Sequence, residues 1–100
     1  MPQMKHIVLL RFKEGTAPSQ VDGFFRDLAN LKGVIAGILD FMGGPYSSHE
    51  GLNQGYTHGF VMTFDSAASR DAYLPHPAHE KVKAAIIPHA ESIVAFDFEA

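Results

Sequence analysis

Four segments of the chain are rich in β-branched and large apolar residues, which is typical of β-strands. The expected strands cover residues 4–13, 38–42, 56–64 and 93–98. In the first segment apolar residues occur at both parities, so this strand is predicted to lie centrally in a sheet and to be covered on both faces. In the third segment one parity is almost wholly apolar, which predicts one buried face.

Between the first two strands the apolar period changes to three and four residues, which predicts a helix over about residues 16–31. Five apolar residues form its stripe: Val21, Phe24, Phe25, Leu28 and Leu31. Thr16 or Ser19 is expected to cap this helix, with Pro18 in its first turn. Gly33 is expected to end it.

Two shorter helices are expected after the third strand. The first covers residues 67–74 and is capped by Asp65 or Ser66. The second begins at Pro77, a favourable first position, and runs to about residue 87, where Pro88 ends it. Residues 43–55 contain four of the nine glycines and are predicted to form a long, exposed loop. The second strand is therefore expected to end before Gly43.

The resulting order is strand, helix, strand, strand, helix, strand. It is typical of the ferredoxin-like split βαβ arrangement, an α+β fold with a four-stranded antiparallel sheet and helices on one face. The face without helices would carry an apolar set: Ile7, Leu9, Val61 and Ile93 or Val94. A soluble monomer rarely leaves so much apolar surface in water, so a homodimer is predicted.

Composition narrows the possible classes of protein. A chain of 100 residues with 46% hydrophobic content has room for one core, so residues 1–100 are expected to form a single domain. The net charge is −3 and no basic cluster occurs beyond Lys81 and Lys83, which argues against nucleic-acid binding. Cysteine is absent and the N-terminal residues lack a long apolar run. A cytoplasmic protein without disulfides or a membrane span is therefore expected.

The richest candidate chemistry is the segment from Tyr73 to His79, which holds one phenol and two imidazoles. His76 is expected to cap the helix that begins at Pro77. His79 would lie in the first turn, where the electropositive helix end keeps an imidazole neutral and able to accept a proton. The structural alternative is that His76 only caps and His79 bonds a loop carbonyl, and the spacing by itself favours this alternative.

Strand parity gives His6 and His58 the same faces as the aromatic residues that mark the helix side of the sheet. Both histidines are therefore predicted to share that face, which Tyr73 and His79 could approach from the helix layer. Parity does not fix the register, so contact between His6 and His58 stays open. A metal site is not expected, because no carboxylate or cysteine stands at ligand spacing beside these histidines.

Several of these motifs resemble the stress-responsive dimeric α/β-barrel (Dabb) family over nearly the whole chain. The matching motifs are Lys5-His6-Ile7-Val8-Leu9, Gly55-Tyr56-Thr57-His58, and Tyr73 followed by His76-Pro77-Ala78-His79. The resemblance implies a homodimer in which two four-stranded sheets close one barrel. It also implies an apolar pocket between helices and sheet, with His6, His58, His76, Phe24, Leu28 and Phe60 as ligand-binding residues and no cofactor.

Two functions follow as alternatives. Most members of the family have no established activity, so a homodimer that binds a small apolar or phenolic ligand without turnover is favoured. One plant member closes a linear tetraketide thioester by intramolecular aldol chemistry, and the resemblance implies the same catalytic pair here, with His79 as base and Tyr73 as hydrogen-bond donor. Leu28 stands where that cyclase has a tyrosine, so the substrate is left open.

Overall fold

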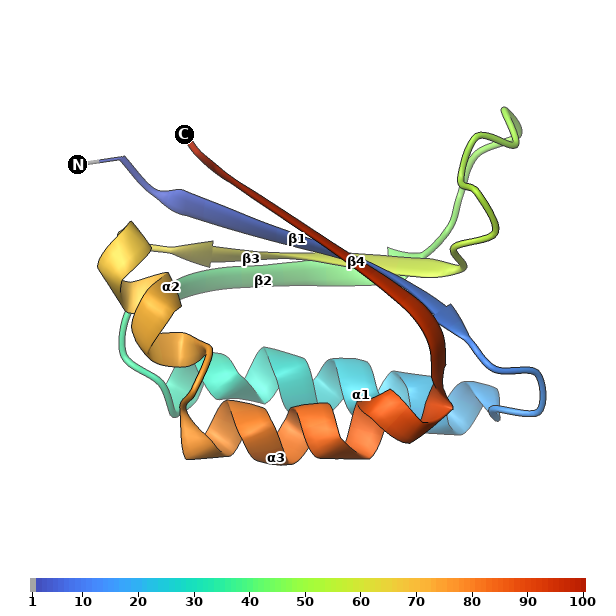
Figure 1. Cartoon of the computed structure of the whole chain (residues 1–100), viewed down its shortest axis with the longest axis horizontal. Helices are drawn as coiled ribbons and strands as arrows, with labels where there is room; N and C mark the ends of the chain where they lie inside the picture. The colour runs from blue at the N-terminus through green and yellow to red at the C-terminus, as the bar shows by residue number, and fades with distance from the viewer. Residues whose placement is uncertain (1) are drawn as a thin grey trace.

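The computed structural model describes residues 2–100 and contains one antiparallel sheet in the order β2-β3-β1-β4 (Figure 1). The strands are β1 (Met4–Phe12), β2 (Ile38–Pro45), β3 (His58–Phe64) and β4 (Ala90–Glu99). β1 is central and pairs with β3 and β4, whereas β2 and β4 are the edges. This is the predicted ferredoxin-like topology.

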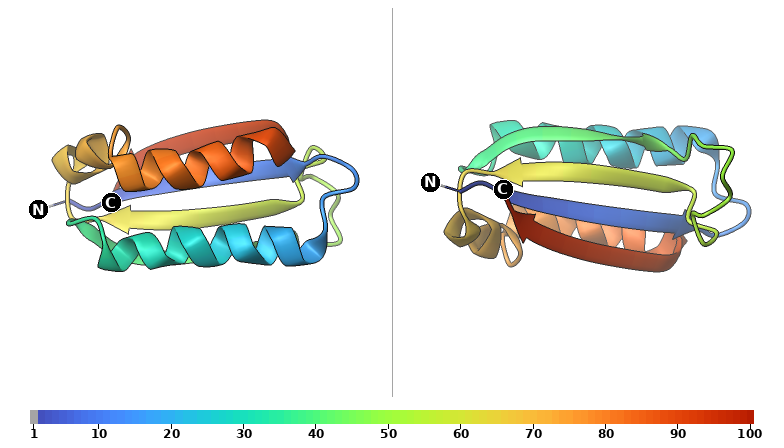
Figure 2. Two further views of the ribbon diagram at one scale, coloured as in Figure 1. Left: turned by 90° about the horizontal axis from the view of Figure 1, so that it is seen from below. Right: turned by 90° about the horizontal axis from the view of Figure 1, so that it is seen from above.

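The helices cover one face of this sheet (Figure 2). α1 (Pro18–Asn30) and α3 (Pro77–Ile86) lie side by side on that face, and α2 (Ala67–Tyr73) lies at one end of the sheet. Short 3-10 turns, η1 (Leu31–Gly33) and η2 (Ile87–His89), follow α1 and α3. No helix within residues 2–100 has both the length and the apolar character needed to cross a membrane.

The core lies between the helices and the sheet, and the predicted parity of β1 and β3 is confirmed. Even-numbered side chains of both strands point into it, including the fully buried Met62 and Phe64. The wider core consists of Met4, Val8, Leu10, Leu28, Leu31, Ile35, Ile38, Phe60, Tyr73 and Ile86. Phe24 and Phe25 of the helix stripe are partly buried against it. The helix layer therefore supplies one apolar stripe to one sheet face, as the sequence pattern predicts.

The caps of α2 and α3 are as predicted, but that of α1 is not. Ser66 Oγ accepts from Ser69 N at 3.1 Å, and His76 Nδ1 accepts from Ala78 N at 3.0 Å. The prediction that Thr16 or Ser19 caps α1 is wrong, because Ala17 occupies the N-cap position. Its backbone N–H donates to Gln20 Oε1 at 3.0 Å, so a side chain from the first turn satisfies the free donor instead.

β2 is longer than predicted, because it continues through Gly43 and Gly44 to Pro45. Pro45 is tolerated because β2 is an edge strand, where a missing N–H need not interrupt a ladder. At Gly43 a Cβ atom would lie 2.7 Å from Phe25 and Phe60 atoms, so this glycine serves close packing in a strand and does not end one. β4 is also longer than predicted, and β3 begins two residues later.

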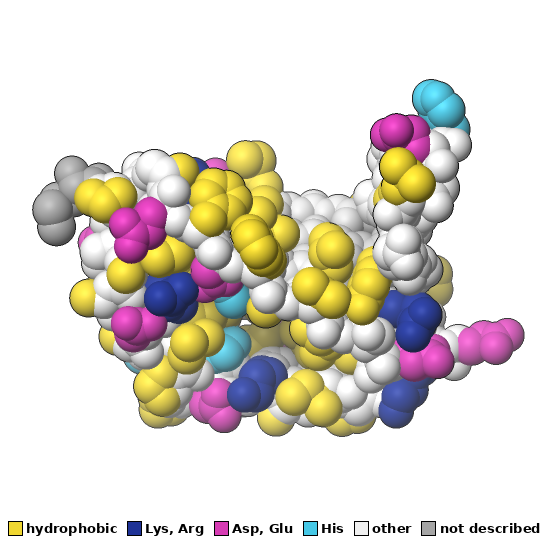
Figure 3. Space-filling view, turned by 45° about the horizontal axis from the view of Figure 1, so that its top comes forward, with side chains coloured by type: hydrophobic (Ala, Val, Ile, Leu, Met, Phe, Trp, Pro, Cys, Tyr) yellow, Lys and Arg dark blue, Asp and Glu magenta, His cyan; other side chains and the backbone are white. Residues whose placement is uncertain are grey.

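The sheet face without helices is open and apolar (Figure 3). β1 contributes Ile7 and Leu9 to it, and β3 contributes Val61. Parity along β4 places Val94, Phe96 and Phe98 there, since they pair with Leu9, Ile7 and Lys5. Phe96 is 65% exposed and Leu9 is 38% exposed. The alternative of Ile93 on this face is excluded, because Ile93 pairs with the inward-facing Leu10.

The connection between β2 and β3 rises from the sheet on this open side (Figure 1). Its base is closed by the backbone bond from Tyr46 N to Thr57 O at 2.8 Å. Within it Gly51 N donates to the Tyr46 hydroxyl at 3.0 Å, and Leu52 is exposed. His49 and Glu50 are exposed as predicted. The loop is therefore held by its own hydrogen bonds and overhangs one end of the open face.

Candidate functional site

A cavity of about 240 Å³ lies between α3 and the strands β1 and β4. Most of its wall is apolar, and the side chains that could do chemistry there are His6, Tyr73, His79 and Lys83. Its remaining lining is Val8, Leu10, Leu28, Phe60, Leu74, Ile86, Ile87, Ile93 and Ala95. Figure 3 shows a hollow with histidine and hydrophobic side chains in it and charged side chains at its rim. The arrangement is typical of a small-molecule site, in which a few polar groups converge on an apolar space.

His79 lies in the first turn of α3 and is oriented by the chain just before that helix. Its Nδ1–H donates to the Leu74 carbonyl at 2.9 Å, which leaves Nε2 as the free acceptor. Burial lowers the pKa of His79 below its ordinary value of 6.5, and the nearby Lys83 charge also lowers it, whereas the Leu74 bond and Glu80 act in the other direction. The imidazole is therefore neutral at neutral pH and can accept a proton.

Tyr73 is the last residue of α2 and is only 1% exposed. Its ring centroid lies 4.1 Å from that of His79 and 6.0 Å from that of His6. Burial raises the pKa of the Tyr73 phenol well above its ordinary value. The hydroxyl consequently stays protonated and acts as a hydrogen-bond donor over the physiological pH range.

His6 is oriented by a charged network that the sequence analysis missed. The His6 Nδ1–H donates to Asp97 Oδ1 at 2.7 Å, and Arg70 Nη1 donates to Asp97 Oδ2 at 2.6 Å. Arg70 Nε also donates to the exposed Asp71 at 2.8 Å. The carboxylate thus fixes the His6 tautomer and turns Nε2 away from the network. Asp97 is the one acidic residue within the predicted strand 93–98, but the sequence pattern does not pair it with His6.

The polar groups of the cavity lie at the edge of the core, and the Tyr73 side chain is itself almost fully buried. Among residues 2–100, the fully buried side-chain nitrogen or oxygen atom that lacks a partner is Arg11 Nε, on the other sheet face. No polar atom of His6, Tyr73 or His79 is both enclosed and unpaired. The Nε2 atom of His79 can therefore accept a hydrogen bond from a ligand that enters the cavity, without a bond inside the protein being broken first.

Comparison with known proteins identifies the family at this point. A sequence model of the Stress responsive A/B Barrel Domain (Dabb) family matches residues 4–100. The chain belongs to the Dabb family. This confirms the resemblance that the motifs suggested, over nearly the full chain.

Named Dabb relatives include proteins with and without a stated activity. The chain is 32% identical to the stress-response A/B barrel domain-containing protein HS1 of Arabidopsis thaliana, over 96% of this chain and 88% of that protein. It is 30% identical to olivetolic acid cyclase of Cannabis sativa, over 95% and 94% of the two chains. A dimeric ferredoxin-like protein of unknown function from Jannaschia sp. CCS1 superimposes with a TM-score of 0.87 and 25% identity, covering 98% and 99%.

The cavity between α3 and the sheet, which we call the histidine cavity, contains five of the eight predicted site residues. His6, Tyr73, His79, Leu28 and Phe60 line it together. Three other residues were predicted for the same pocket, namely His76, Phe24 and His58, and none of them lines this cavity. His76 is occupied as the α3 cap, and the Phe24 ring packs 6.1 Å from Phe12 and 5.5 Å from His89.

His58 is separated from His6 by the strand register. His6 pairs with Met62, whereas His58 pairs with Leu10 at the other end of β1. Four residues of strand correspond to about 13 Å. The His58 ring packs against Phe12 and Phe25, its Nδ1 lies 2.8 Å from Thr57 Oγ1, and burial lowers its pKa. The shared face was predicted, but the two histidines do not form one site.

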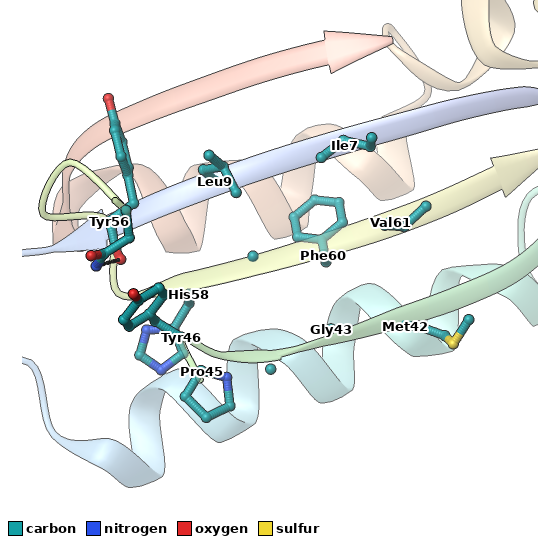
Figure 4. A pocket seen from close by; sticks show the side chains of 13 residues that line it. Ile7, Leu9, Met42, Gly43, Pro45, Tyr46, Tyr56, His58, Phe60 and Val61 are labelled. Atoms are coloured by element: carbon teal, nitrogen blue, oxygen red, sulfur yellow. Dashed lines mark hydrogen bonds between the residues drawn. The ribbon is translucent and has the colours of Figure 1, made fainter. Parts of the chain in front are cut away.

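A second hollow of about 430 Å³ lies on the open sheet face (Figure 4). Ile7, Leu9 and Val61 form its floor, and Tyr46 and Tyr56 stand at its end by the projecting loop. It is larger than the histidine cavity but lacks Tyr73 and His79. It belongs to the apolar sheet face that a dimer would cover.

No group of three or more His, Cys, Asp or Glu side chains within residues 2–100 is arranged to hold a metal ion. His6 is committed to Asp97 and His79 to Leu74 through their Nδ1 atoms.

Proposed function

We propose that this Dabb protein is a homodimer that binds a small apolar or phenolic molecule in the cavity between α3 and the sheet. The observation that carries the proposal is the combination of an apolar space with the phenol of Tyr73 and the neutral imidazole of His79. A cavity of about 240 Å³ suits one ring with a short substituent, since a cavity of about 150 Å³ holds benzene.

The dimer is supported by the open sheet face and by a relative. Exposed apolar side chains of β1, β2 and β4 lie together on that face, and a second copy would remove them from water. The Jannaschia protein with the same fold is dimeric. Two sheets stacked face to face would form the barrel for which the family is named, with the helix layers and their cavities on the outside.

A second candidate function is cofactor-free aldol cyclisation, which the similarity to olivetolic acid cyclase favours. The α-proton of a polyketone would move to His79 Nε2, and the enolate oxygen would accept a hydrogen bond from Tyr73. The enolate carbon would then attack a second carbonyl carbon of the same molecule. The alkoxide so formed would take the proton back from the His79 imidazolium, so that no external reactant is needed.

Thermal melts run beside ligand titrations of His79→Ala and Tyr73→Phe test the site. Using 4-propylphenol as the probe, we expect both variants to weaken binding while the dimer stays intact. A purely structural His79 predicts the reverse pattern: a loss of about 1 to 3 kcal/mol of stability, with binding by the folded protein unchanged. That pattern would refute the proposed site.

Turnover is tested separately with a linear polyketone, by using chromatography to separate the cyclic aldol, an isomer of the substrate, from the linear compound. Cyclisation that is lost in His79→Ala would establish the catalytic alternative. Binding of 4-propylphenol without any cyclisation would support the binding function and refute the cyclase alternative.

A further inference from the structure

The mouth of the histidine cavity carries a cation that the proposed binding function does not use. Lys83 lies one helical turn after His79 on α3 and lines the same cavity. Its side chain is 48% exposed, so its aliphatic part contacts the cavity while the ammonium group reaches water. Lys83 is the one lysine or arginine among the residues that line this cavity.

We propose that the natural ligand of this cavity carries a carboxylate, which Lys83 binds at the mouth while the apolar part of the ligand fills the interior. This inference rests on the proposed binding function and deepens it by naming the class of ligand. An apolar wall with one cation at its rim matches an amphiphilic acid, in which a ring is followed by a charged group.

The carboxylates already near the cavity leave Lys83 available for such a ligand. Asp97 is engaged by His6 at 2.7 Å and by Arg70 at 2.6 Å. Glu80 is the partner of Lys83, with Oε1 and Nζ 3.2 Å apart, but both side chains are 48% exposed. Ion pairs so open to water are weak and rearrange easily, so a carboxylate held by the cavity can replace Glu80.

The position of His79 agrees with an anionic ligand. Lys83 contributes to the lowered pKa of His79, after burial, because the two positive charges would repel. A bound carboxylate would neutralise Lys83 and relieve this repulsion. His79 Nε2 would then hydrogen-bond the polar substituent of the ring, while Lys83 holds the acid one turn away.

The test compares 4-propylbenzoate with its neutral analogue 4-propylbenzamide by calorimetric titration at neutral pH and low salt. We expect the wild type to bind the benzoate about two- to fivefold more tightly, as for other partly exposed ion pairs. Lys83→Met, which keeps the aliphatic part of the side chain, should abolish this preference. Glu80→Gln should enlarge the preference, because the ligand no longer competes with Glu80.

Lys81→Met is the matched control, since Lys81 is exposed on the same helix and does not line the cavity. It removes the same charge and should keep the preference. Equal affinities in the wild type, or a preference that survives Lys83→Met, would overturn the inference and leave the binding function standing. Failure of both probes and of 4-propylphenol to bind would overturn the binding function as well.

Discussion

At the residue scale, the bond from His79 Nδ1–H to the Leu74 carbonyl determines what this imidazole can do. The sequence also allowed a purely structural His79 that hydrogen-bonds a loop carbonyl, and the structure contains this bond. It does not compete with a chemical role, because it fixes the tautomer that leaves Nε2 free. The lowered pKa of His79 agrees with the expected neutral imidazole, and its main cause is burial of the ring.

The pH dependence of His79 follows from that burial. Its pKa is lowered from 6.5, so the folded state resists protonation more than the unfolded state does. The stability that neutral His79 contributes is present above pH 6.5 and is lost as the pH falls through the lowered folded value. We expect the His79 ring signals in an NMR titration to change with a midpoint below 6.5, using His79→Gln to assign them. A midpoint at or above 6.5 would contradict the burial that the structure shows.

The position of a site residue was predictable where it depended only on strand parity or on a helix cap. Parity alone placed His6 and Phe60 on the helix side, and the proline after His76 predicted its capping role. The contact of His6 with Asp97 was not predictable, because it joins positions 91 residues apart through a register that parity leaves open. The separation of His58 from His6 escaped prediction for the same reason.

At the element scale, α2 is tied to the sheet by Arg70. Its guanidinium bonds Asp97 on β4, which in turn bonds His6 on β1, so three elements meet in one charged network. The side chains of Arg70 and Asp97 are each 20% exposed, so the pair is only partly screened by water. The network holds the end of α2, where Tyr73 lies.

Replacing Arg70 should therefore affect stability through Asp97. Arg70→Gln is expected to cost about 1 to 2 kcal/mol in urea denaturation, because a partly buried carboxylate loses a charged donor. Asp71→Asn is the matched control and should change little, since the Asp71 side chain is 67% exposed. Equal stabilities of wild type and Arg70→Gln would mean that the network does not hold α2.

The elements themselves were mostly predictable, and the exceptions have local causes. Apolar strand segments identified the four strands, helical spacing identified α1, and caps and prolines identified α2 and α3, which together gave the order of the fold. β2 was predicted too short because Gly43 and Pro45 normally interrupt strands, whereas an edge position and close packing under Phe25 accommodate them here. Edge position depends on the whole topology and is not visible in a local pattern.

At the scale of the whole molecule, we expect the open sheet face to be the interface of a homodimer. Light scattering at micromolar concentration should give about twice the chain mass of 10.9 kDa. Leu9→Glu should split or unfold the dimer, because a charge buried without a partner is costly. Val34→Glu is the control, as Val34 is an equally apolar exposed residue in the turn after η1. A wild-type monomer would contradict the stacked-sheet dimer.

The central claim is that the cavity between α3 and the sheet, and not the larger hollow on the open face, holds the ligand. Isotope-filtered NOE spectra of the labelled protein with 4-propylphenol test it directly. We predict contacts from the probe to Tyr73, Leu28 and Ile86, which line the histidine cavity. Contacts to Leu9, Val61 or Met42 instead would place the ligand on the open face and contradict this account.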